Sequence, residues 1–459
     1  MKLTFCWAAK IVTWSCYYIE TWSTKFLVDC GMFQGPKEVN RLNYEPFLFN
    51  PKEIEFVLLT HAHIDHCGLI PKLYKQGFNG KIYATSATID LAQIMFEDSA
   101  HIQEKNIEDE NRRRAKTGQA PRFPMYTVDD ALACKKLFTP VEYGKTCILN
   151  ENIQAKFNDA WHILGSENIE LFVTEWNVTK KLVFSGDIGQ RDTPIIQDPT
   201  LIQEADYLFM ESTYGDKKHE DTAGKKELLI KYITETYKRW WKLLIPSFSV
   251  ERTQELLYFF NIIIKEGNFP AEKIFLDSPL SVKATEIFKK HTEIFDEEAT
   301  KTYPHPFDFP ELECTESVED SIKLNTYNGP CIIIAGNGMC TSGRITHHLR
   351  HGLWDKKNTV LFVGYQADGT LGRYILEGEK RVRMMGIEVD VNAEIKKINW
   401  FSGHADGDQL VRRAEGFTKA PTKTFIIHGE WNAQTTLKTR LEELHFTCEI
   451  PSMKEQIEL

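Results

Sequence analysis

The sequence predicts an α/β protein with two or three domains, and three observations carry that prediction. At 459 residues the chain is too long for a single hydrophobic core. The first 60 residues contain short apolar runs separated by turn residues, which is typical of β-strands. From about residue 209 onward, helix-like segments alternate with apolar strands, and this alternation indicates a parallel sheet flanked by helices.

The strands and helices of the first part follow from the same patterns. Strands are expected at Lys2 to Trp7, Cys16 to Glu20, Lys25 to Asp29, Ile54 to Thr60 and Lys81 to Ala84. Helices are expected at His66 to Gln76, ending at Gly77, and at Ala87 to Lys116. In the second part, strands are expected at Leu243 to Ile245, Ile274 to Leu276, Cys331 to Ala335 and Thr359 to Val363.

Composition places the chain among ordinary soluble globular proteins, with 42% hydrophobic and 26% charged residues. Its ten cysteines form no Cys-x-x-Cys pair, which argues against a zinc ribbon or a disulfide framework and favours a reducing cytoplasm. No segment approaches the roughly 20 apolar residues of a membrane span, so no membrane association is expected.

The net charge of −10 is unfavourable for a broad nucleic-acid surface, because phosphate binding depends on Lys and Arg. Metal ions or a local basic groove can still supply the positive charge that a phosphate needs. The basic run Arg112-Arg113-Arg114 is read as a solvated helix face, with RNA contact as the alternative.

The run His61-Ala62-His63-Ile64-Asp65-His66 indicates a metal site, because it places four candidate ligands within six residues after an apolar strand. Two histidines two positions apart can share one ion, while Asp65 and His66 reach a second position nearby. Neutral imidazole and carboxylate suit Zn²⁺, with manganese as the alternative. A His-rich surface loop would be the simpler interpretation, but it leaves this density of ligands unexplained.

Further candidate ligands stand where later strands end, at His162, Asp187 and His428. The two carboxylate oxygens of an aspartate can each bind one ion, so Asp187 is a candidate bridge. Asp29 ends an early strand and is expected to brace the metal loop from behind the ligands.

Together these motifs resemble the metallo-β-lactamase superfamily and, within it, the β-CASP nucleases that process RNA in bacteria and cleave pre-mRNA 3′ ends. Three later motifs carry the β-CASP part of the resemblance: Glu211 in Phe209 to Gly215, His404 in Phe401 to Asp406, and His428. The resemblance covers nearly the whole chain. It implies an αββα sandwich built from residues 1–208 and 396–459, with a β-CASP domain inserted at 209–395 and the active site between the domains.

The resemblance also implies the roles of the site residues. His61, His63 and His162 would hold one zinc ion, Asp65, His66 and His428 the other, and Asp187 would bridge them. Asp65, Glu211 and His404 would be catalytic, with His404 as general acid and Glu211 bonded to its other ring nitrogen. The implied reaction is two-metal hydrolysis of single-stranded RNA, by endonucleolytic or 5′-exonucleolytic cutting, to 5′-phosphate and 3′-hydroxyl ends.

Three segments of the insert resemble the family's substrate-contact loops, since hydroxyls, helix starts and Arg side chains suit phosphates. The candidate RNA-binding residues are Ser247, Ser249, Arg252, Thr253, Ser342, Arg344, Gln366, Thr370 and Arg373. For His347 and His348, packing is as good an explanation as phosphate contact.

Two other functions are alternatives. One keeps the fold and metals but acts on DNA or a small ester. Because the DNA-specific relatives tend to replace the last histidine motif by an apolar residue, His428 favours RNA. The other is a catalytically silent scaffold, which the full ligand set disfavours. A homodimer is compatible with the sequence but not indicated by it.

The chain departs from the family pattern by having tryptophan where the family has glycine, at Trp7, Trp14, Trp22, Trp161, Trp240, Trp241 and Trp400. The other three tryptophans, Trp176, Trp354 and Trp431, stand in turn-like sequence where glycine would be unremarkable. One hypothesis is that these codons are UGA, translated as Trp although the source reads them as Gly. The alternative is ordinary sequence drift with compensating packing.

Overall fold

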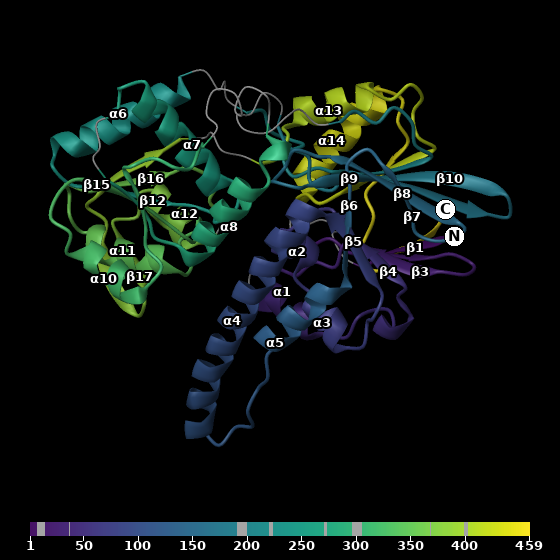
Figure 1. Cartoon of the computed structure of the whole chain (residues 1–459), viewed down its shortest axis with the longest axis horizontal. Coiled ribbons are helices and arrows are strands. Elements are labelled where there is room, and N and C mark those ends of the chain that lie inside the picture. Colours follow the sequence, from purple (N-terminus) through teal and green to yellow (C-terminus); the bar gives the residue numbers. More distant parts are fainter. Residues whose placement is uncertain are drawn as a thin grey trace. The chain divides into compact units, whose positions relative to one another are not determined.

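The computed structural model describes residues 1–6, 14–35, 37–190, 200–219, 224–269, 273–295, 305–367, 369–398 and 403–459. The chain folds into two compact units (Figure 1). The first unit contains the described residues up to Lys218 together with His404–Leu459, and the second contains those from His219 to Gly403.

The first sheet of unit 1 has seven strands in the order β22-β1-β2-β3-β4-β5-β6. The strands are β1 Lys2–Phe5, β2 Tyr17–Glu20, β3 Lys25–Val28, β4 Phe56–Leu58, β5 Lys81–Thr85, β6 Phe138–Val141 and β22 Gln456–Glu458. From β3 to β6 the neighbouring strands are parallel, so β3 and β4 direct their carboxyl ends to one edge of the sheet.

The second sheet of unit 1 also has seven strands, in the order β21-β20-β11-β10-β9-β8-β7. They are β7 Thr146–Ile148, β8 Ile153–Asp159, β9 Glu167–Glu175, β10 Val178–Phe184, β11 Tyr207–Glu211, β20 Lys423–Ile427 and β21 Cys448–Glu449. Strand β11 runs parallel to both β10 and β20, so the chain's C-terminal part lies beside Glu211 in this sheet.

The two sheets pack face to face through a shared apolar core. Phe5 of the first sheet lies 6.0 Å from Phe209 and 5.4 Å from Phe425 of the second, measured between ring centroids. Burial of such side chains is the main favourable term in folding. On the outer face of the second sheet, Met210 and Ile426 share a core with Leu410 and Leu437 of the C-terminal helices.

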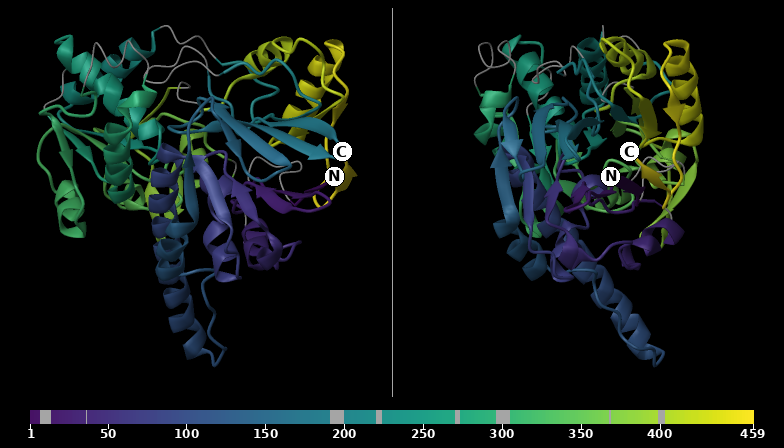
Figure 2. Two further views of the ribbon diagram at one scale, coloured as in Figure 1. Left: turned by 45° about the vertical axis from the view of Figure 1, so that its right-hand side comes forward. Right: turned by 90° about the vertical axis from the view of Figure 1, so that its right-hand side faces the viewer.

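Helices cover the outer faces of both sheets (Figure 2). The second sheet is covered by α13 Gly407–Glu415 and α14 Trp431–Glu443. The other helices of unit 1 are α1 Lys37–Arg41, α2 Ile64–Cys67, α3 Ile70–Lys75, α4 Ser86–Lys116 and α5 Val128–Ala133. The first turns of α4 lie against β5 and β6, and its far half extends beyond the strands of its unit. The expected αββα sandwich is therefore confirmed.

Unit 2 is built on a six-stranded parallel sheet in the order β14-β13-β15-β12-β16-β19. Its strands are β12 Lys242–Pro246, β13 Ile274–Leu276, β14 Leu312–Cys314, β15 Cys331–Ala335, β16 Thr359–Phe362 and β19 Glu394–Lys397. Its helices are α6 Lys225–Lys238, α7 Arg252–Lys265, α8 Pro279–Lys290, α10 Val318–Asn325, α11 Arg344–Gly352 and α12 Leu371–Leu376. The strands β17 Arg381–Met384 and β18 Ile387–Asp390 form a separate hairpin.

The expected elements differ from the observed ones at two places. The single helix expected at His66 to Gln76 is wrong: α2 and α3 replace it, since Gly68 ends the first helix and Pro71 stands in the first turn of the second. The expected boundaries at 208/209 and 395/396 fall inside β11 and β19, whereas the two units divide at 218/219 and 403/404. Strands pair along their whole length, so each of these two stays with its own sheet.

The strands expected in unit 2 agree with β12, β13, β15 and β16. In unit 1, the strand expected to reach Trp7 is observed as β1 as far as Phe5, and Trp7 itself lies outside the described residues. Among the described helices, none is both long enough and apolar enough to cross a membrane.

A buried carboxylate holds together the carboxyl end of the parallel sheet in unit 2. Asp277 directly follows β13, and its side chain is fully buried. It accepts hydrogen bonds from Nε2 of His348 at 2.6 Å, NH1 of Arg344 at 2.6 Å, and the hydroxyls of Thr315 and Ser321 at 2.5 and 2.6 Å. Burial raises the pKa of Asp277, but the hydrogen bond from His348 and those from Ser321 and Thr315 outweigh it and lower the pKa to about 2.

We expect Asp277→Asn to destabilise the protein by about 3 kcal/mol at neutral pH, because it leaves buried donors without their anion. A carboxyl whose folded-state pKa is depressed stabilises the fold above its unfolded pKa, so this contribution is lost as the pH falls from about 4 to about 2. Denaturant unfolding of variant and parent should therefore differ at pH 7 and converge in acid. The exposed surface pair of Asp390 with Arg381 supplies the control, Asp390→Asn, which should change stability little. A difference for Asp277→Asn that persists unchanged at the lowest pH would contradict this.

Candidate active site

The histidine run lies where β4 reaches the edge of the first sheet of unit 1. Strand β4 ends at Leu58, His61 and His63 follow in the connecting segment, and α2 begins at Ile64. Asp65 and His66 therefore lie on the first turn of a helix, while the two earlier histidines precede it. This change from extended to helical backbone lets one short segment supply ligands in two directions.

The first group of candidate ligands consists of His61, His63, His162 and Asp187. Nδ1 of His63 lies 3.2 Å from Nε2 of His61 and 3.0 Å from Nε2 of His162. Oδ2 of Asp187 is 3.6 Å from each of those Nε2 atoms. Ligand atoms of a tetrahedral zinc ion are separated by roughly 3.3 Å, given Zn–N bonds of about 2.0 Å. The four atoms are therefore spaced as ligands of one metal ion.

The second group consists of Asp65, His66 and His428. Nε2 of His428 lies 3.3 Å from Nε2 of His66 and 3.5 Å from Oδ2 of Asp65. His428 follows β20, so it reaches this group from the far end of the chain. The structure thus brings together residues separated by more than 360 positions in the sequence.

Asp187 connects the two groups. Its Oδ2 atom faces the first group, whereas its Oδ1 atom lies 3.3 Å from Nε2 of His66 and 3.5 Å from Nδ1 of His428. The residue follows β10 and Gly186, whose φ of 54° turns the chain next to Thr60. This is the arrangement expected of a bridging carboxylate.

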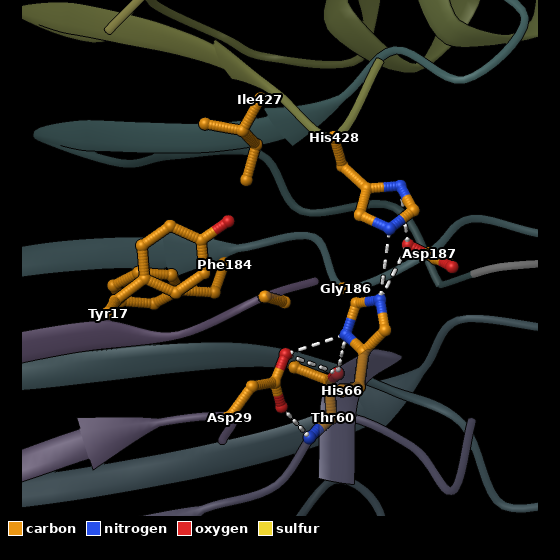
Figure 3. Close-up of a pocket in the computed structure, with 10 residues that line it drawn as sticks. Tyr17, Asp29, Thr60, His66, Phe184, Gly186, Asp187, Ile427 and His428 are labelled. Carbon is orange, nitrogen blue, oxygen red and sulfur yellow. Dashed lines mark hydrogen bonds and ion pairs between the residues drawn. The ribbon is translucent and has the colours of Figure 1, made fainter. Parts of the chain in front are cut away.

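Asp29 and Thr60 hold His66 from behind. Oδ2 of Asp29 accepts the Nδ1 proton of His66 at 2.7 Å and the Thr60 hydroxyl at 2.9 Å, and Oδ1 accepts the Thr60 N–H at 2.8 Å (Figure 3). With Nδ1 as the donor to Asp29, the Nε2 atom of His66 is directed toward His428 and Asp187. This geometry suits the bracing role expected of Asp29.

Burial keeps two histidines of the first group neutral. Burial lowers the pKa of His61 well below its usual value, and it lowers the pKa of His63 to about 4. For His66, burial acts in the same direction, but the carboxylates of Asp187 and Asp29 outweigh it and raise the pKa. Metal-binding histidines must be deprotonated, so His61 and His63 already meet that requirement at neutral pH.

A second pair, Glu211 and His404, lies beside the ligands. Glu211 ends β11, is fully buried, and accepts N–H bonds from Ile188 at 2.7 Å and Thr213 at 3.1 Å. Its Oε1 lies 3.1 Å from Nδ1 of His404, which is 3.9 Å from Oδ2 of Asp187. Burial lowers the pKa of His404, but the charges of Glu211 and Asp187 outweigh it and raise the pKa to about 9. The imidazole is therefore protonated at neutral pH.

His66 and His428 border a small cavity on the side of the apolar core (Figure 3). Tyr17, Phe184 and Ile427 line its inner end, while Asp187 and His428 line the other. Apolar walls behind the ligands keep bulk water from one side of the cluster, which strengthens its electrostatic interactions.

The three predicted RNA-contact segments lie in unit 2, each after a strand of the parallel sheet. Ser247 and Ser249 follow β12, Ser342 and Arg344 follow β15, and Gln366 follows β16. Nε2 of Gln366 donates to the carbonyl of Gly338 at 3.0 Å, which ties the third segment to the second. All three therefore meet at one edge of the sheet, where parallel α/β folds bind ligands.

Several of these side chains already have partners inside unit 2. Arg252 is buried and donates to Glu255 at 2.7 Å, while Arg344 donates to Asp277 and to two backbone carbonyls. Thr253 donates to the Phe248 carbonyl, Thr370 caps α12, and Arg373 donates to Glu377.

His348 is buried against Asp277, whereas His347 is exposed. Ser342 is exposed, and the Ser249 hydroxyl lies 3.4 Å from that of Ser278.

Sequence reasoning missed three residues that the structure connects to these sites. Thr60 contacts His61, His66 and Asp29, and its position directly before the histidine run could have revealed it. Thr213 lies 3.2 Å from Nδ1 of His428 through its hydroxyl. Asp277 had no sequence signal, because its partners come from three separate segments of unit 2: α11, α10 and the residue after β14.

Comparisons with known proteins agree with this geometry. Three family models match: the metallo-β-lactamase superfamily over residues 14–123, the Beta-Casp domain over 253–375, and the Zn-dependent metallo-hydrolase RNA specificity domain over 388–451. A solved structure from Enterococcus faecalis, titled a protein of unknown function, matches with a TM-score of 0.54 at 13% identity, covering 100% of this chain and 99% of that one. That likeness concerns the fold.

Three relatives are similar over most of the chain. Ribonuclease TTHA0252 of Thermus thermophilus is 36% identical over 92% of both chains. The transcription termination factor FttA of Methanocaldococcus jannaschii is 32% identical over 94% of this chain and 67% of its own. An RNase J-like protein of the same organism is 31% identical over 91% of this chain and 89% of its own. The chain belongs to the β-CASP ribonucleases of the metallo-β-lactamase superfamily and is a metal-dependent hydrolase.

Proposed function

We propose that this protein is a zinc-dependent ribonuclease that hydrolyses single-stranded RNA by a two-metal mechanism and leaves 5′-phosphate and 3′-hydroxyl ends. The observation that carries the proposal is the convergence of two ligand groups on the two oxygens of Asp187. RNA as substrate is supported by the match to an RNA specificity domain and by the similarity to a ribonuclease.

The chemistry of the donor set fits metal ions. In each group, imidazole nitrogens face one another at 3.0 to 3.3 Å. At this distance two ring nitrogens need either a shared proton or a metal cation between them. Histidine-rich groups with one or two carboxylates suit zinc better than magnesium or calcium, which prefer oxygen ligands. We assign His61, His63 and His162 to one ion, Asp65, His66 and His428 to the other, and Asp187 to both.

Residues of the chain itself would donate the proton that the departing 3′ oxygen needs. Bound metal ions would supply positive charge that promotes ionisation of a water nucleophile and offsets the charge of the phosphodiester. His404 is protonated at neutral pH and can give its Nε2 proton to the departing 3′ oxygen. Glu211 holds Nδ1 of this ring and keeps the imidazolium charged until the transfer. These roles make His404 the general acid.

The edge of unit 2 where its three segments meet is the proposed contact for the RNA backbone. The hydroxyls of Ser249 and Ser342 and the start of α11 at Arg344 offer donors for phosphate oxygens. The free thiols of all ten cysteines are consistent with action in the reducing cytoplasm, which we also propose. A homodimer is compatible with the sequence, and no observation on the described residues favours it.

The first test is the dependence of RNA cleavage on metal. We expect a chelator to abolish cleavage of a 5′-labelled single-stranded RNA and added Zn²⁺ or Mn²⁺ to restore it. Sequencing the cut ends should give 5′-phosphates. RNA cleavage that persists without metal would contradict the mechanism, while preferential cleavage of DNA or a small ester would identify another substrate on the same fold.

The second test is the general acid. His404→Ala should lower the rate of RNA cleavage by roughly 10²- to 10⁴-fold with metal content unchanged. His101→Ala, an exposed histidine on α4, is the matched control and should retain the parent rate. Full activity of His404→Ala would rule out this role.

The third test is the pH dependence. Since the Glu211 carboxylate raises the pKa of His404, the protonated imidazole persists to higher pH, and activity should fall only as the pH rises toward about 9. In Glu211→Gln the pKa of His404 falls, so this decline in kcat/KM should begin at lower pH. If kcat/KM declined at the same alkaline pH in both proteins, Glu211 would not be raising the pKa of His404.

The fourth test concerns Asp29. Asp29→Asn should weaken metal binding by about 10- to 100-fold, because the imidazole of His66 loses its anionic partner. Asparagine tolerates the residue's φ of 57°, so the backbone should be retained. Competition against a chromogenic chelator measures the affinity, and Asp390→Asn serves as the control. Equal affinities would refute the bracing role.

A further inference from the structure

Half of the tryptophans in the described part of the chain have a backbone conformation that suits glycine. Eight of the ten tryptophans are described, and Trp14, Trp161, Trp176 and Trp240 have φ between 53° and 89°. Only a few per cent of non-glycine residues adopt positive φ, mostly Asn, Asp and His. Thirteen of the 27 glycines do so here. Tryptophan in this chain therefore follows the backbone distribution of glycine.

Trp176 lies in the two-residue hairpin between β9 and β10, where Glu175 pairs with Val178. Both turn residues have positive φ, 53° for Trp176 and 64° for Asn177. A two-residue turn of this kind has a twist that matches the twist of the flanking strands. Because both of its residues need positive φ, glycine and asparagine are strongly preferred there. The Trp176 side chain is 84% exposed, so little burial compensates for its strained backbone. Glycine followed by Asn177 would be the ordinary sequence for this hairpin.

Trp240 stands at the position where many helices end in glycine. Helix α6 ends at Lys238 with Arg239 as its cap, and Trp240 follows with φ 61°. Its N–H donates to the Tyr237 carbonyl at 2.7 Å, which is one of the two bonds of a Schellman motif. The motif needs a left-handed residue at this place, and glycine adopts that conformation without a Cβ clash. The indole is 67% exposed.

Trp14 and Trp161, which also have positive φ, lie inside unit 1 in surroundings that disfavour an indole side chain. The ring centroids of Trp14 and Phe33 are only 2.5 Å apart, well inside the 4.5 to 7 Å of packed aromatic pairs, so the site lacks space for both rings. Trp161 directly precedes His162, and its indole nitrogen is buried with no hydrogen-bond partner among the described residues. Both positions adjoin the metal loop: the residue after Trp14, Ser15, donates its N–H to the Asp65 carbonyl at 2.7 Å.

We propose that the natural protein has glycine at all ten positions that this sequence writes as tryptophan, because each codon is UGA and the source reads UGA as glycine. The four sites have separate structural reasons for glycine: a hairpin turn, a helix end and two crowded loops at the metal site. A single change in the meaning of one codon accounts for all of them. Independent drift would have to produce tryptophan at four glycine-type positions separately.

The remaining positions are compatible with the same replacement. Trp22, Trp354 and Trp431 are more than half exposed, so glycine there removes no side chain from the core. Trp241 is partly exposed, and its ring lies 4.8 Å from Nζ of Lys357. Trp7 and Trp400 lie outside the described residues, and the codon assignment alone extends the proposal to them. The natural protein would then contain no tryptophan, and its near-ultraviolet absorbance would come mainly from its 16 tyrosines.

Peptide mass spectrometry of the protein from its source cells tests the proposal directly. Trypsin should release Phe157–Lys180, which contains Trp161 and Trp176, and Ile11–Lys25, which contains Trp14 and Trp22. We expect each peptide to have a mass lower by two tryptophan-to-glycine replacements, and the gene to have UGA at all ten codons. Tryptophan in either peptide, or UGG at any of the ten codons, would overturn the proposal.

Melting temperatures of recombinant variants give a second, independent measurement. Trp176→Gly and Trp240→Gly should each raise the melting temperature by on the order of a few degrees, because they remove left-handed strain. Trp354→Gly is the matched control: its side chain is 56% exposed, but its φ is not positive, so it should gain nothing. Equal or lower melting temperatures for the first two variants than for the control would contradict a glycine at those positions.

Discussion

The active-site region depends on one constraint, namely that six candidate metal ligands must gather around the two oxygens of a single buried aspartate. Asp187 faces His61 and His162 through one oxygen and His66 through the other. Such a cluster of facing imidazoles and carboxylates is unfavourable by itself, because desolvated lone pairs and charges repel. Bound cations remove this penalty, so metal binding and the stability of this region should be coupled.

The surrounding fold can be understood as support for that cluster. Strands β3 and β4 bring Asp29 and the histidine run to one sheet edge, and β10, β11 and β20 bring Asp187, Glu211 and His428 to the edge of the facing sheet. Asp29 orients His66, and Glu211 orients His404, so each sheet contributes one carboxylate that fixes a histidine. The two seven-stranded sheets therefore have to pack in one register for the site to exist.

Much of this could be predicted from the sequence, because the informative residues lie next to strands. The run from His61 to His66 and the later His162 and Asp187 each follow an apolar strand, which marks them as edge residues. The Asp277 network could not be predicted, since its partners come together only through the parallel sheet of unit 2. The helix expected at His66 to Gln76 was wrong because Pro71 interrupts a helix at an interior position and suits the first turn of a new one. The tryptophan pattern was visible in the sequence, but only the backbone angles show which positions require glycine.

Metal stoichiometry tests most directly whether Asp187 joins two metal sites. Elemental analysis of the purified protein, after dialysis against buffered zinc, should give two zinc ions per chain. Asp187→Ala should reduce the content of both sites together, since its two oxygens serve one site each, whereas His101→Ala should leave two ions bound. One ion or none in the parent protein, or an Asp187→Ala variant that retains two, would contradict a bridging role for this aspartate.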